Sequence, residues 1–508
     1  MTSRQSHHPR DARFMMAVDQ GTTGTRTILF NREGVAVSSS YEEVEQIYPR
    51  PGWVEHDAQA YYPGVLRTAR AALETANATH GDVGGIGITC QRETTVLWNR
   101  TTGMPVANAI VWMCRRTTEI CEELRRNGYE QQVREKTGLF IDPYFSATKI
   151  TWLLDTVPGL REEAESGEIC MGTVDSWLIW QMSGGRCHVT DYSNASRTML
   201  LNIHDLQWDA ELLEALRIPP AILPELKPSS GVLAYTDEES FGARLPISGV
   251  AGDQHAATFG QACFDTGSAK NTYGTGIALM MNIGREPLLS NHGLTTNLAW
   301  HVHGAVDYAL EGVIFSGGAA LQWLRDGLRL VQSAGECEEL ATQVEDTGGL
   351  YLVPAFTGLC APYWDPYARG AVVGITRGTS VPHVVRAALE SMAYQTRDLV
   401  ESMEHDCGES INCVRVDGGA ASNNFLMQFQ ADILGIAIER PAVTEMAALG
   451  AAYLAGLGVG FWEDQTELAN NWRLDRRFEP HMGADRREEL YAGWKKAVTR
   501  SLKWISNV

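Results

Sequence analysis

The chain lacks the features of several common protein classes. None of its apolar runs approaches the ~18 residues that a membrane span requires, and the N-terminal segment MTSRQSHHPRDAR has no apolar stretch like that of a secretory signal. Acidic residues (62) outnumber basic residues (42), which gives a net charge of -20. This charge argues against a nucleic-acid partner, because such binding depends on clustered Lys and Arg. We therefore expect a cytoplasmic protein with no membrane span and no nucleic-acid partner.

Three familiar site signatures are also missing. The ten cysteines stand singly, without the Cys-x-x-Cys spacing of zinc sites, and are expected to be reduced thiols. None of the lysines follows a glycine, which excludes the phosphate loop G-x-x-x-x-G-K-[ST]. No G-x-G-x-x-G follows an apolar strand, which argues against a dinucleotide-binding dehydrogenase.

Apolar strands and amphipathic helices alternate along the chain, which indicates a mixed α/β protein. DQGTTGTRTILF (19–30) predicts a strand, a Gly-containing hairpin and a second strand, and NTYGTGIALMMN (271–282) repeats the pattern. A duplicated unit explains both hairpins. We expect a disordered lead-in over residues 1–13, a first lobe over 14–262 and a second over 263–508, with the two lobes meeting near Gln261.

Glycine-rich turns with nearby acids follow several of these strands. Glycine lets backbone N–H groups approach an anion, and Thr hydroxyls add donors without charge, so such turns suit phosphate. Asp19 and Asp253 each follow an apolar strand beside a Gly turn. Together they match the needs of phosphoryl transfer, one acid to hold Mg²⁺ through water and another to accept a proton. The alternative is that each carboxylate caps a turn.

The segment QRETT (91–95) places Arg92 and Glu93 at the end of a buried strand. A guanidinium beside a carboxylate satisfies the donor and the acceptor of a polyol hydroxyl; the alternative is a surface salt bridge. Trp112 and Tyr144 are candidates for an apolar wall beside the polyol carbons, although either is also suited to the core.

The sequence resembles the FGGY carbohydrate kinases, and among them the glycerol kinases, from about residue 15 to 504. The resemblance is carried by DQGTTGTR, QIYPRPGWVEHD, GITCQRETT, NAIVWMCRRT, IDPYFSATK, TDYSNASRTML, ISGVAGDQHAATFGQ, KNTYGTG, ALEGVIFSGGAALQWLRD, VPAFTGLCAPYWDPYARG and VDGGAASNNFLMQFQADILG. It implies two actin-like (ribonuclease H-like) lobes with an interlobe nucleotide cleft. It also implies ATP-dependent phosphorylation of glycerol to sn-glycerol 3-phosphate, the first step of glycerol degradation.

The resemblance further implies roles for individual residues, with ATP and Mg²⁺ as the cofactors. Asp253 is expected to be the general base, and Asp19 to assist Mg²⁺ through water. The glycerol-binding residues are expected to be Arg92, Glu93, Trp112, Tyr144, Asp253 and Gln254. The ATP-binding residues are expected to be Thr22, Thr23, Gly24, Arg26, Thr275, Gly318, Gln322, Gly419 and Asn423.

The sequence departs from the family pattern at three positions. Gly24 stands where a Ser is expected, Ala278 replaces an aromatic residue near the glycerol carbons, and His255 stands where a Gln is expected. The smaller Ala278 keeps open the alternative of a longer polyol or a sugar such as xylulose or ribulose.

Regulation and assembly also follow from the resemblance. Gly242 and Arg244 match a loop that binds fructose 1,6-bisphosphate in some members, and the family forms homodimers or homotetramers. A nucleotide-binding regulatory or scaffold protein without chemistry is a further alternative, against which both Asp19 and Asp253 argue.

Overall fold

Two mixed sheets form the frame of the computed structural model, which describes residues 9–505. The first sheet has six strands in the order β13-β14-β5-β1-β2-β3 and the second has seven in the order β17-β18-β16-β15-β21-β22-β23. The strands of the first are β1 (Phe14–Gln20), β2 (Gly24–Phe30), β3 (Ala36–Glu43), β5 (Val83–Cys90), β13 (Ser230–Tyr235) and β14 (Pro246–Gly252). Those of the second are β15 (Ala269–Tyr273), β16 (Ile277–Gly284), β17 (Thr295–Val302), β18 (Ala305–Ile314), β21 (Cys413–Asp417), β22 (Ala437–Pro441) and β23 (Leu474–Phe478).

The cores of the two sheets share one topology. Strands β1, β2 and β3 pair antiparallel, and β5 and then β14 extend the sheet in parallel with β1. In the second sheet β15, β16 and β18 form the antiparallel part, and β21 and then β22 continue in parallel with β15. This repeated arrangement confirms the expected pair of ribonuclease H-like lobes.

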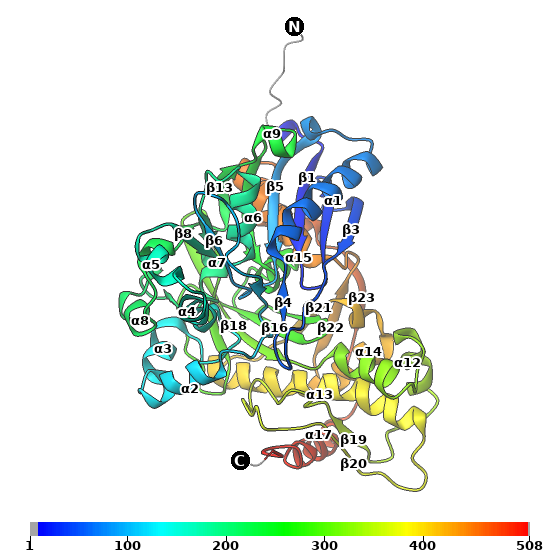
Figure 1. The fold of residues 1–508 in the computed structure, drawn as a ribbon. Helices are drawn as coiled ribbons and strands as arrows, with labels where there is room; N and C mark the ends of the chain where they lie inside the picture. Colours follow the sequence, from blue (N-terminus) through cyan, green and yellow to red (C-terminus); the bar gives the residue numbers. More distant parts are fainter. Residues whose placement is uncertain (1–8, 506–508) are drawn as a thin grey trace.

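Two helices lie between the sheets, α10 (Asp253–Gly260) and α15 (Met446–Val459). Met15 and Ala17 of β1 pack against them, while the alternate residues of β1 pack under α1 (Tyr61–Thr75) and α6 (Val174–Met182). The two helices approach so closely that a Cβ on Gly450 would lie 1.8 Å from the carbonyl oxygen of Ala256. Although α15 belongs to the second half of the sequence, it therefore covers a face of the first sheet, where Figure 1 labels it beside β1 and β5.

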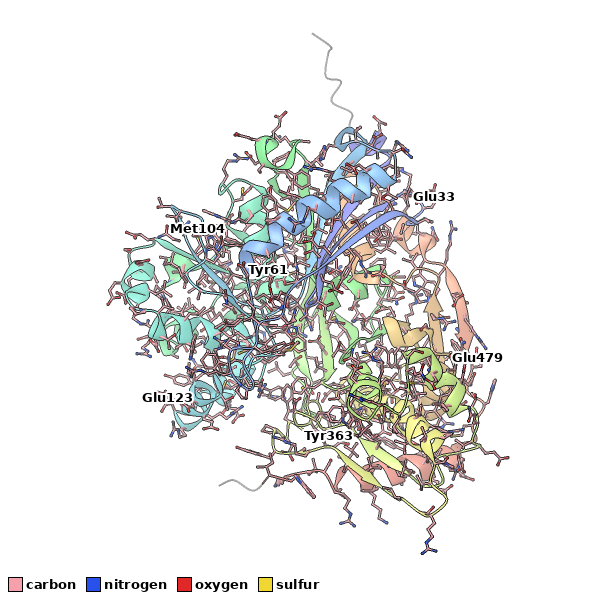
Figure 2. The ribbon with its side chains drawn as sticks, turned by 45° about the vertical axis from the view of Figure 1, so that its right-hand side comes forward. Glu33, Tyr61, Met104, Glu123, Tyr363 and Glu479 are labelled. Carbon is pink, nitrogen blue, oxygen red and sulfur yellow. The ribbon has the colours of Figure 1, made fainter. Side chains whose placement is uncertain are left out.

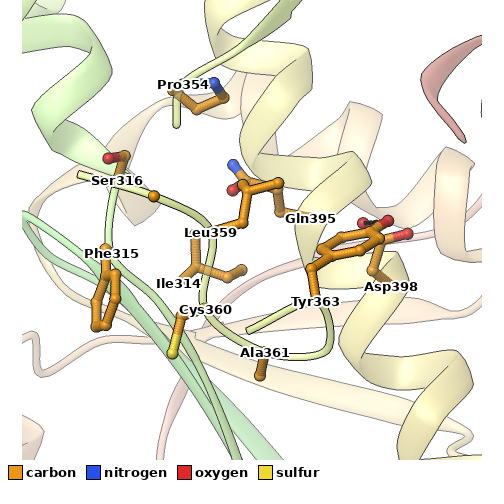
Figure 3. A pocket seen from close by; sticks show the side chains of 11 residues that line it. Ile314, Phe315, Ser316, Pro354, Leu359, Cys360, Ala361, Tyr363, Gln395 and Asp398 are labelled. Carbon is orange, nitrogen blue, oxygen red and sulfur yellow. Dashed lines mark hydrogen bonds between the residues drawn. The ribbon is translucent and has the colours of Figure 1, made fainter. Parts of the chain in front are cut away.

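The outer face of the second sheet is covered by α13 (Val381–Cys407) and α14 (Asn424–Leu434). Figure 1 shows α13 in yellow along the bottom of the molecule, above the C-terminal α17 (Ala484–Val498) in red. Asp398 of α13 accepts hydrogen bonds from Tyr363 (3.0 Å), Tyr491 (2.6 Å) and Trp494 (2.9 Å). Burial raises the pKa of this carboxyl to about 6. Figure 3 shows Tyr363 beside Asp398 at a small cavity that is also lined by Ile314, the last residue of β18. Figure 2 shows Tyr363 far from Tyr61, which begins α1 of the first lobe.

Most predicted elements are present with shifted ends. The helix expected from Ala58 to about Thr79 is α1 (Tyr61–Thr75), flanked by short 3₁₀ turns. GTVDSWLIWQM, for which strand and helix were both open, contains α6; this helix is buried on nearly all sides, so periodicity could not decide between them. The remaining helices of eight or more residues are α2 (Thr118–Arg126), α3 (Glu130–Thr137), α4 (Ser146–Thr156) and α12 (Ala334–Ala341).

The sequence predicted a disordered lead-in over residues 1–13. Residues 1–8 of that segment lie outside the described residues. Pro9–Asp11 then form a 3₁₀ turn, and the backbone N–H of Arg13 donates to the carbonyl of Asp82, so ordered chain begins within that segment. Across residues 9–505, none of the helices combines the length and the apolar character that a membrane crossing needs.

Candidate active site

The carboxyl ends of three parallel strands bring the predicted catalytic residues to one edge of the first sheet. Asp19 lies at the end of β1, Arg92 and Glu93 follow β5, and Asp253 follows β14 as the first residue of α10. Ligand crevices in open α/β sheets form at such edges. The predicted pattern of a strand followed by an acid is therefore present at this edge of the sheet.

One cavity of about 500 Å³ unites the residues expected to bind the polyol. Its lining includes all six of them, Arg92, Glu93, Trp112, Tyr144, Asp253 and Gln254. The same lining contains Thr22 and Thr23 from the first hairpin, Thr275 and Gln322 from the second lobe, and Ala278. The cavity thus lies between the lobes and brings the polar groups together with threonines expected to face the ATP phosphates.

Trp112 and Tyr144 form an aromatic corner of this cavity. Their rings meet edge to face with centroids 5.6 Å apart, and Trp112 Nε1 donates to Thr22 Oγ1 at 2.9 Å. The indole therefore connects this aromatic corner to the hairpin that contains Thr22. Burial raises the pKa of Tyr144, so its hydroxyl stays protonated and can donate a hydrogen bond.

Arg92 is buried, with a side chain 3% exposed, so the alternative of a surface salt bridge is wrong. Its Nε lies 3.1 Å from Asp253 Oδ1, and its Nη2 lies 2.6 Å from Glu311 Oε1 on β18 of the second lobe. Glu93 is more distant, 3.9 Å from Arg92 Nε, and pairs instead with Arg197 at 2.6 Å. The guanidinium of Arg92 thus connects the expected base with a carboxylate of the other lobe.

Glu93 has a backbone φ of +62°, which is uncommon for a residue other than glycine. Its carbonyl accepts hydrogen bonds from Thr95 Oγ1 (3.1 Å), Ser146 Oγ (3.1 Å) and Lys149 Nζ (3.2 Å), and these donors hold the conformation. Lys149 also donates to the carbonyl of Tyr144 at 2.5 Å. Burial lowers the pKa of Lys149 to about 8. Strained backbone held in this way is typical of functional sites.

Asp253 begins α10, and its Oδ1 accepts from the backbone N–H of Gln254 at 2.7 Å as well as facing Arg92. The Gln254 side-chain oxygen accepts from Lys270 Nζ of β15, which also donates to Thr272 Oγ1 at 2.8 Å. Lys270 therefore connects Gln254 of the first lobe to the β15–β16 hairpin of the second lobe. No sequence signal had indicated this lysine.

His255 is fully buried, and among the described residues neither of its ring nitrogens has a hydrogen-bond partner. Burial, with Arg92 nearby, holds the pKa of His255 well below its usual value. The ring is therefore neutral at physiological pH, and this departure from the family pattern adds no charge beside Asp253.

A second cavity of about 380 Å³ lies on the second lobe and has the composition expected for a nucleotide site. Five predicted ATP-binding residues line it, Thr275, Gly318, Gln322, Gly419 and Asn423. Thr275 and Gln322 also line the first cavity, so the two cavities are adjoining. Asn423 caps α14 by accepting from the backbone N–H of Leu426 at 2.9 Å.

Arg26 and Gly24, on β2, do not line either of these two cavities. Arg26 forms an ion pair with Glu445, at the start of α15, and lines a third cavity of about 720 Å³ on the other side of the Gly418–Gly419 turn. Gly24 packs beneath Tyr41, where a Cβ would lie 2.4 Å from the ring. Glycine at this position is therefore required by the packing.

Asp19 fits the role of a magnesium partner in its electrostatics. Burial, and after it the negative charge of Asp253, raise the pKa of Asp19 to about 7. A divalent cation would reduce the repulsion between Asp19 and Asp253, of which Asp253 is already paired with Arg92, and a hard cation such as Mg²⁺ prefers carboxylate oxygen. Among the residues that the structure describes, no group of three or more His, Cys, Asp or Glu is arranged to hold a metal ion.

Gly242 and Arg244 lie away from the cleft. Gly242 ends α9 (Glu238–Phe241) with φ +93° and lines a surface cavity of about 400 Å³ with His80 and Arg70. The Arg244 guanidinium stacks 3.6 Å over the ring of Tyr235.

Comparison with known proteins agrees with this arrangement. Residues 14–260 match the N-terminal domain of the FGGY family of carbohydrate kinases, and residues 269–459 match its C-terminal domain. The chain belongs to the FGGY family of carbohydrate kinases. Glycerol kinase 2 of Thermotoga maritima is 59% identical over 492 residues, covering 97% of this chain and 99% of the relative. A glycerol kinase of Caldanaerobacter subterraneus subsp. tengcongensis is 57% identical over 493 residues with the same coverage.

Among solved structures, this FGGY kinase is similar to the crystal structure of Plasmodium falciparum glycerol kinase with ADP. The TM-score is 0.89 at 35% identity, and the match covers 96% of this chain and 98% of the other. The expected family and the two-lobed kinase fold are therefore confirmed.

Proposed function

We propose that this FGGY kinase transfers the γ-phosphoryl group of ATP to a terminal hydroxyl of glycerol, giving sn-glycerol 3-phosphate and ADP. The observation that carries the proposal is the adjoining pair of cavities: Asp253, Arg92 and Glu93 line one, glycine-rich turns line the other, and Thr275 and Gln322 belong to both. The names of the relatives at 56–59% identity support glycerol as the acceptor.

In this mechanism Asp253 accepts the proton of the attacking hydroxyl while the new O–P bond forms and the bond to the β-phosphate oxygen breaks. Arg92 and Glu93 orient the acceptor through hydroxyl hydrogen bonds, and Trp112 excludes water from the carbon side. The backbone N–H groups of the two hairpins and the hydroxyls of Thr22 and Thr275 are directed to the phosphates. Mg²⁺ bound with ATP neutralises charge on the transferred group, and Asp19 would hold its water shell.

The test is ADP release by the purified protein with Mg²⁺ and ATP, using glycerol, dihydroxyacetone, erythritol, xylulose and ribulose as acceptors. We expect glycerol to give the highest kcat/KM. Asp253→Asn should lower kcat by about 10² to 10⁴, the usual worth of a general base, with little change in Tm. Wild-type turnover in this variant would remove Asp253 from the role of base.

The same panel decides between the alternatives. Ala278 is smaller than the aromatic residue expected beside the acceptor carbons, and it favours a longer polyol as the second candidate. A preference for erythritol or xylulose would establish that candidate. Tight nucleotide binding with no ADP release on any acceptor would establish a regulatory or scaffold protein.

The proposal also includes a cytoplasmic location, assembly into homodimers or homotetramers, and inhibition by fructose 1,6-bisphosphate through Gly242 and Arg244. The last of these is supported by the family pattern at Gly242 and Arg244. Gly242 lines an exposed cavity with Arg70 and His80, whose lining also includes Glu74 and Glu239 but not Arg244. Full activity in millimolar fructose 1,6-bisphosphate would refute it.

A further inference from the structure

A fully buried carboxylate stands behind the polyol site and belongs to the other lobe. Glu311 lies on β18, its side chain is 0% exposed, and it is not among the residues that line the acceptor cavity. Its Oε1 pairs with Arg92 Nη2 at 2.6 Å, and its Oε2 pairs with Arg197 Nη1 at 2.8 Å. Any effect of Glu311 on the acceptor must therefore pass through Arg92 or, by way of Arg197, through Glu93.

The surrounding groups fix Glu311 in a single arrangement. Arg197 donates through Nε to Glu93 (2.6 Å) and through Nη1 to the Asn297 side-chain oxygen (2.6 Å), so its guanidinium cannot turn away. Burial alone would raise the pKa of Glu311, but the charges of Arg197 and Arg92 outweigh burial and lower the pKa to about 2. Glu311 therefore remains ionised throughout the physiological range.

The charges also show what the loss of Glu311 would do. Arg92 would keep Asp253 as its only close carboxylate, since Glu93 is 3.9 Å away and already paired with Arg197. A buried guanidinium without a full set of partners is costly, and Arg92 would move toward Asp253. That movement withdraws Arg92 from the acceptor hydroxyl and engages the base that must accept the proton.

We propose that Glu311 is a positioning residue of the acceptor site. It lies between Arg197 and Arg92 and holds the Arg92 guanidinium in a position from which it can contact both the acceptor hydroxyl and Asp253. The inference rests on the proposed function. It gives the second lobe a part in acceptor recognition as well as in nucleotide binding.

The experiment compares Glu311→Gln with wild type by initial rates, varying glycerol and ATP separately, and records Tm. Glutamine keeps the shape and removes the charge. We expect kcat/KM for glycerol to fall about 10- to 100-fold, because the variant removes one charge of a buried ion pair, while the KM for ATP is unchanged.

Glu390→Gln is the matched control. Glu390 is a buried carboxylate of the same lobe that accepts from Arg386 Nε at 2.8 Å and lies outside the linings of the acceptor and nucleotide cavities. Its substitution should leave the glycerol constants as in wild type. If Glu390→Gln and Glu311→Gln lowered activity equally, Glu311 would have a purely structural role and the inference would be wrong.

Glu311→Asp provides a second variant in case the charge loss prevents folding. Aspartate keeps the negative charge, but its side chain is one methylene shorter, so the carboxylate lies farther from Arg92. We therefore expect a smaller loss in kcat/KM for glycerol than in Glu311→Gln, with the KM for ATP again unchanged. Wild-type glycerol constants in either folded variant would overturn the inference. If the wild-type protein itself does not use glycerol, the proposed function fails, and the best acceptor of the panel takes its place in the same comparison.

Discussion

Replacing Asp19 with Asn should make the ligand-free protein more stable at pH 8 while impairing its magnesium-dependent activity. The folded structure raises the pKa of Asp19 from 3.8 to about 7, because the carboxyl is buried and Asp253 repels its charge. In the unfolded chain the group ionises near pH 4. Between these values the folded state binds more protons than the unfolded state, so this group makes the protein less stable as pH rises.

The size of the expected change in stability follows from the raised pKa of Asp19. Below about pH 4 Asp19 is protonated in both states and contributes nothing; above about pH 7 it is ionised in both and the full cost is present. Holding the pKa of Asp19 at about 7 instead of 3.8 costs about 4 kcal/mol of stability above pH 7. Asparagine removes this cost, so the Tm of Asp19→Asn should exceed that of wild type at pH 8, and the difference should vanish near pH 4.

The assay is thermal unfolding at pH 4, 6 and 8 in EDTA without nucleotide, together with kinase rates at varied Mg²⁺. Asp209→Asn is the control with the opposite sign: although burial would raise the pKa of Asp209, hydrogen bonds from Lys136 and the backbone of Leu212 lower it. That variant should be less stable than wild type at pH 8. An Asp19→Asn protein no more stable than wild type at pH 8, or one with unchanged Mg²⁺ dependence, would refute the reasoning.

Two further substitutions test the shape of the site. Gly24→Ala should displace the first hairpin and raise the KM for ATP, because its Cβ would lie 2.4 Å from the ring of Tyr41, at a cost of about 1–3 kcal/mol. Gly21→Ala, whose nearest contact would be 3.5 Å away, is the control, and equal ATP constants in the two variants would contradict the packing argument. Ala278→Phe should narrow the acceptor cavity and increase the ratio of kcat/KM for glycerol to that for erythritol about 10-fold; an unchanged ratio would show that Ala278 does not border the acceptor.

The sequence was sufficient to predict the strand-end acids and the duplicated hairpins. Asp19 and Asp253 follow short apolar runs, and the parallel pairing of β1, β5 and β14 then brings them together. The partners of Arg92 could not be predicted in this way. Glu311 lies within the apolar strand ALEGVIF, and this pattern predicts that its carboxylate is buried. The pattern does not predict which basic residue of the other lobe forms an ion pair with it.

Helix α15 illustrates a second limit. Its sequence, EMAALGAAYLAG, is rich in small and apolar residues and indicated a buried helix. Which sheet it covers depends on the crossing with α10 at Gly450, a contact between residues nearly 200 positions apart in the chain. Neither periodicity nor composition carries that information.

The position of α15 means that the two halves of the gene product are not independent folding units. A fragment ending near residue 262 would contain α10 and every strand of the first sheet but would leave Met15, Ala17 and Ile28 without α15, the second helix of their core cluster. The complementary fragment would carry α15 with no sheet to cover. Co-expressed halves would therefore have to associate in order to fold, because the crossing of α10 and α15 is part of the core of the molecule.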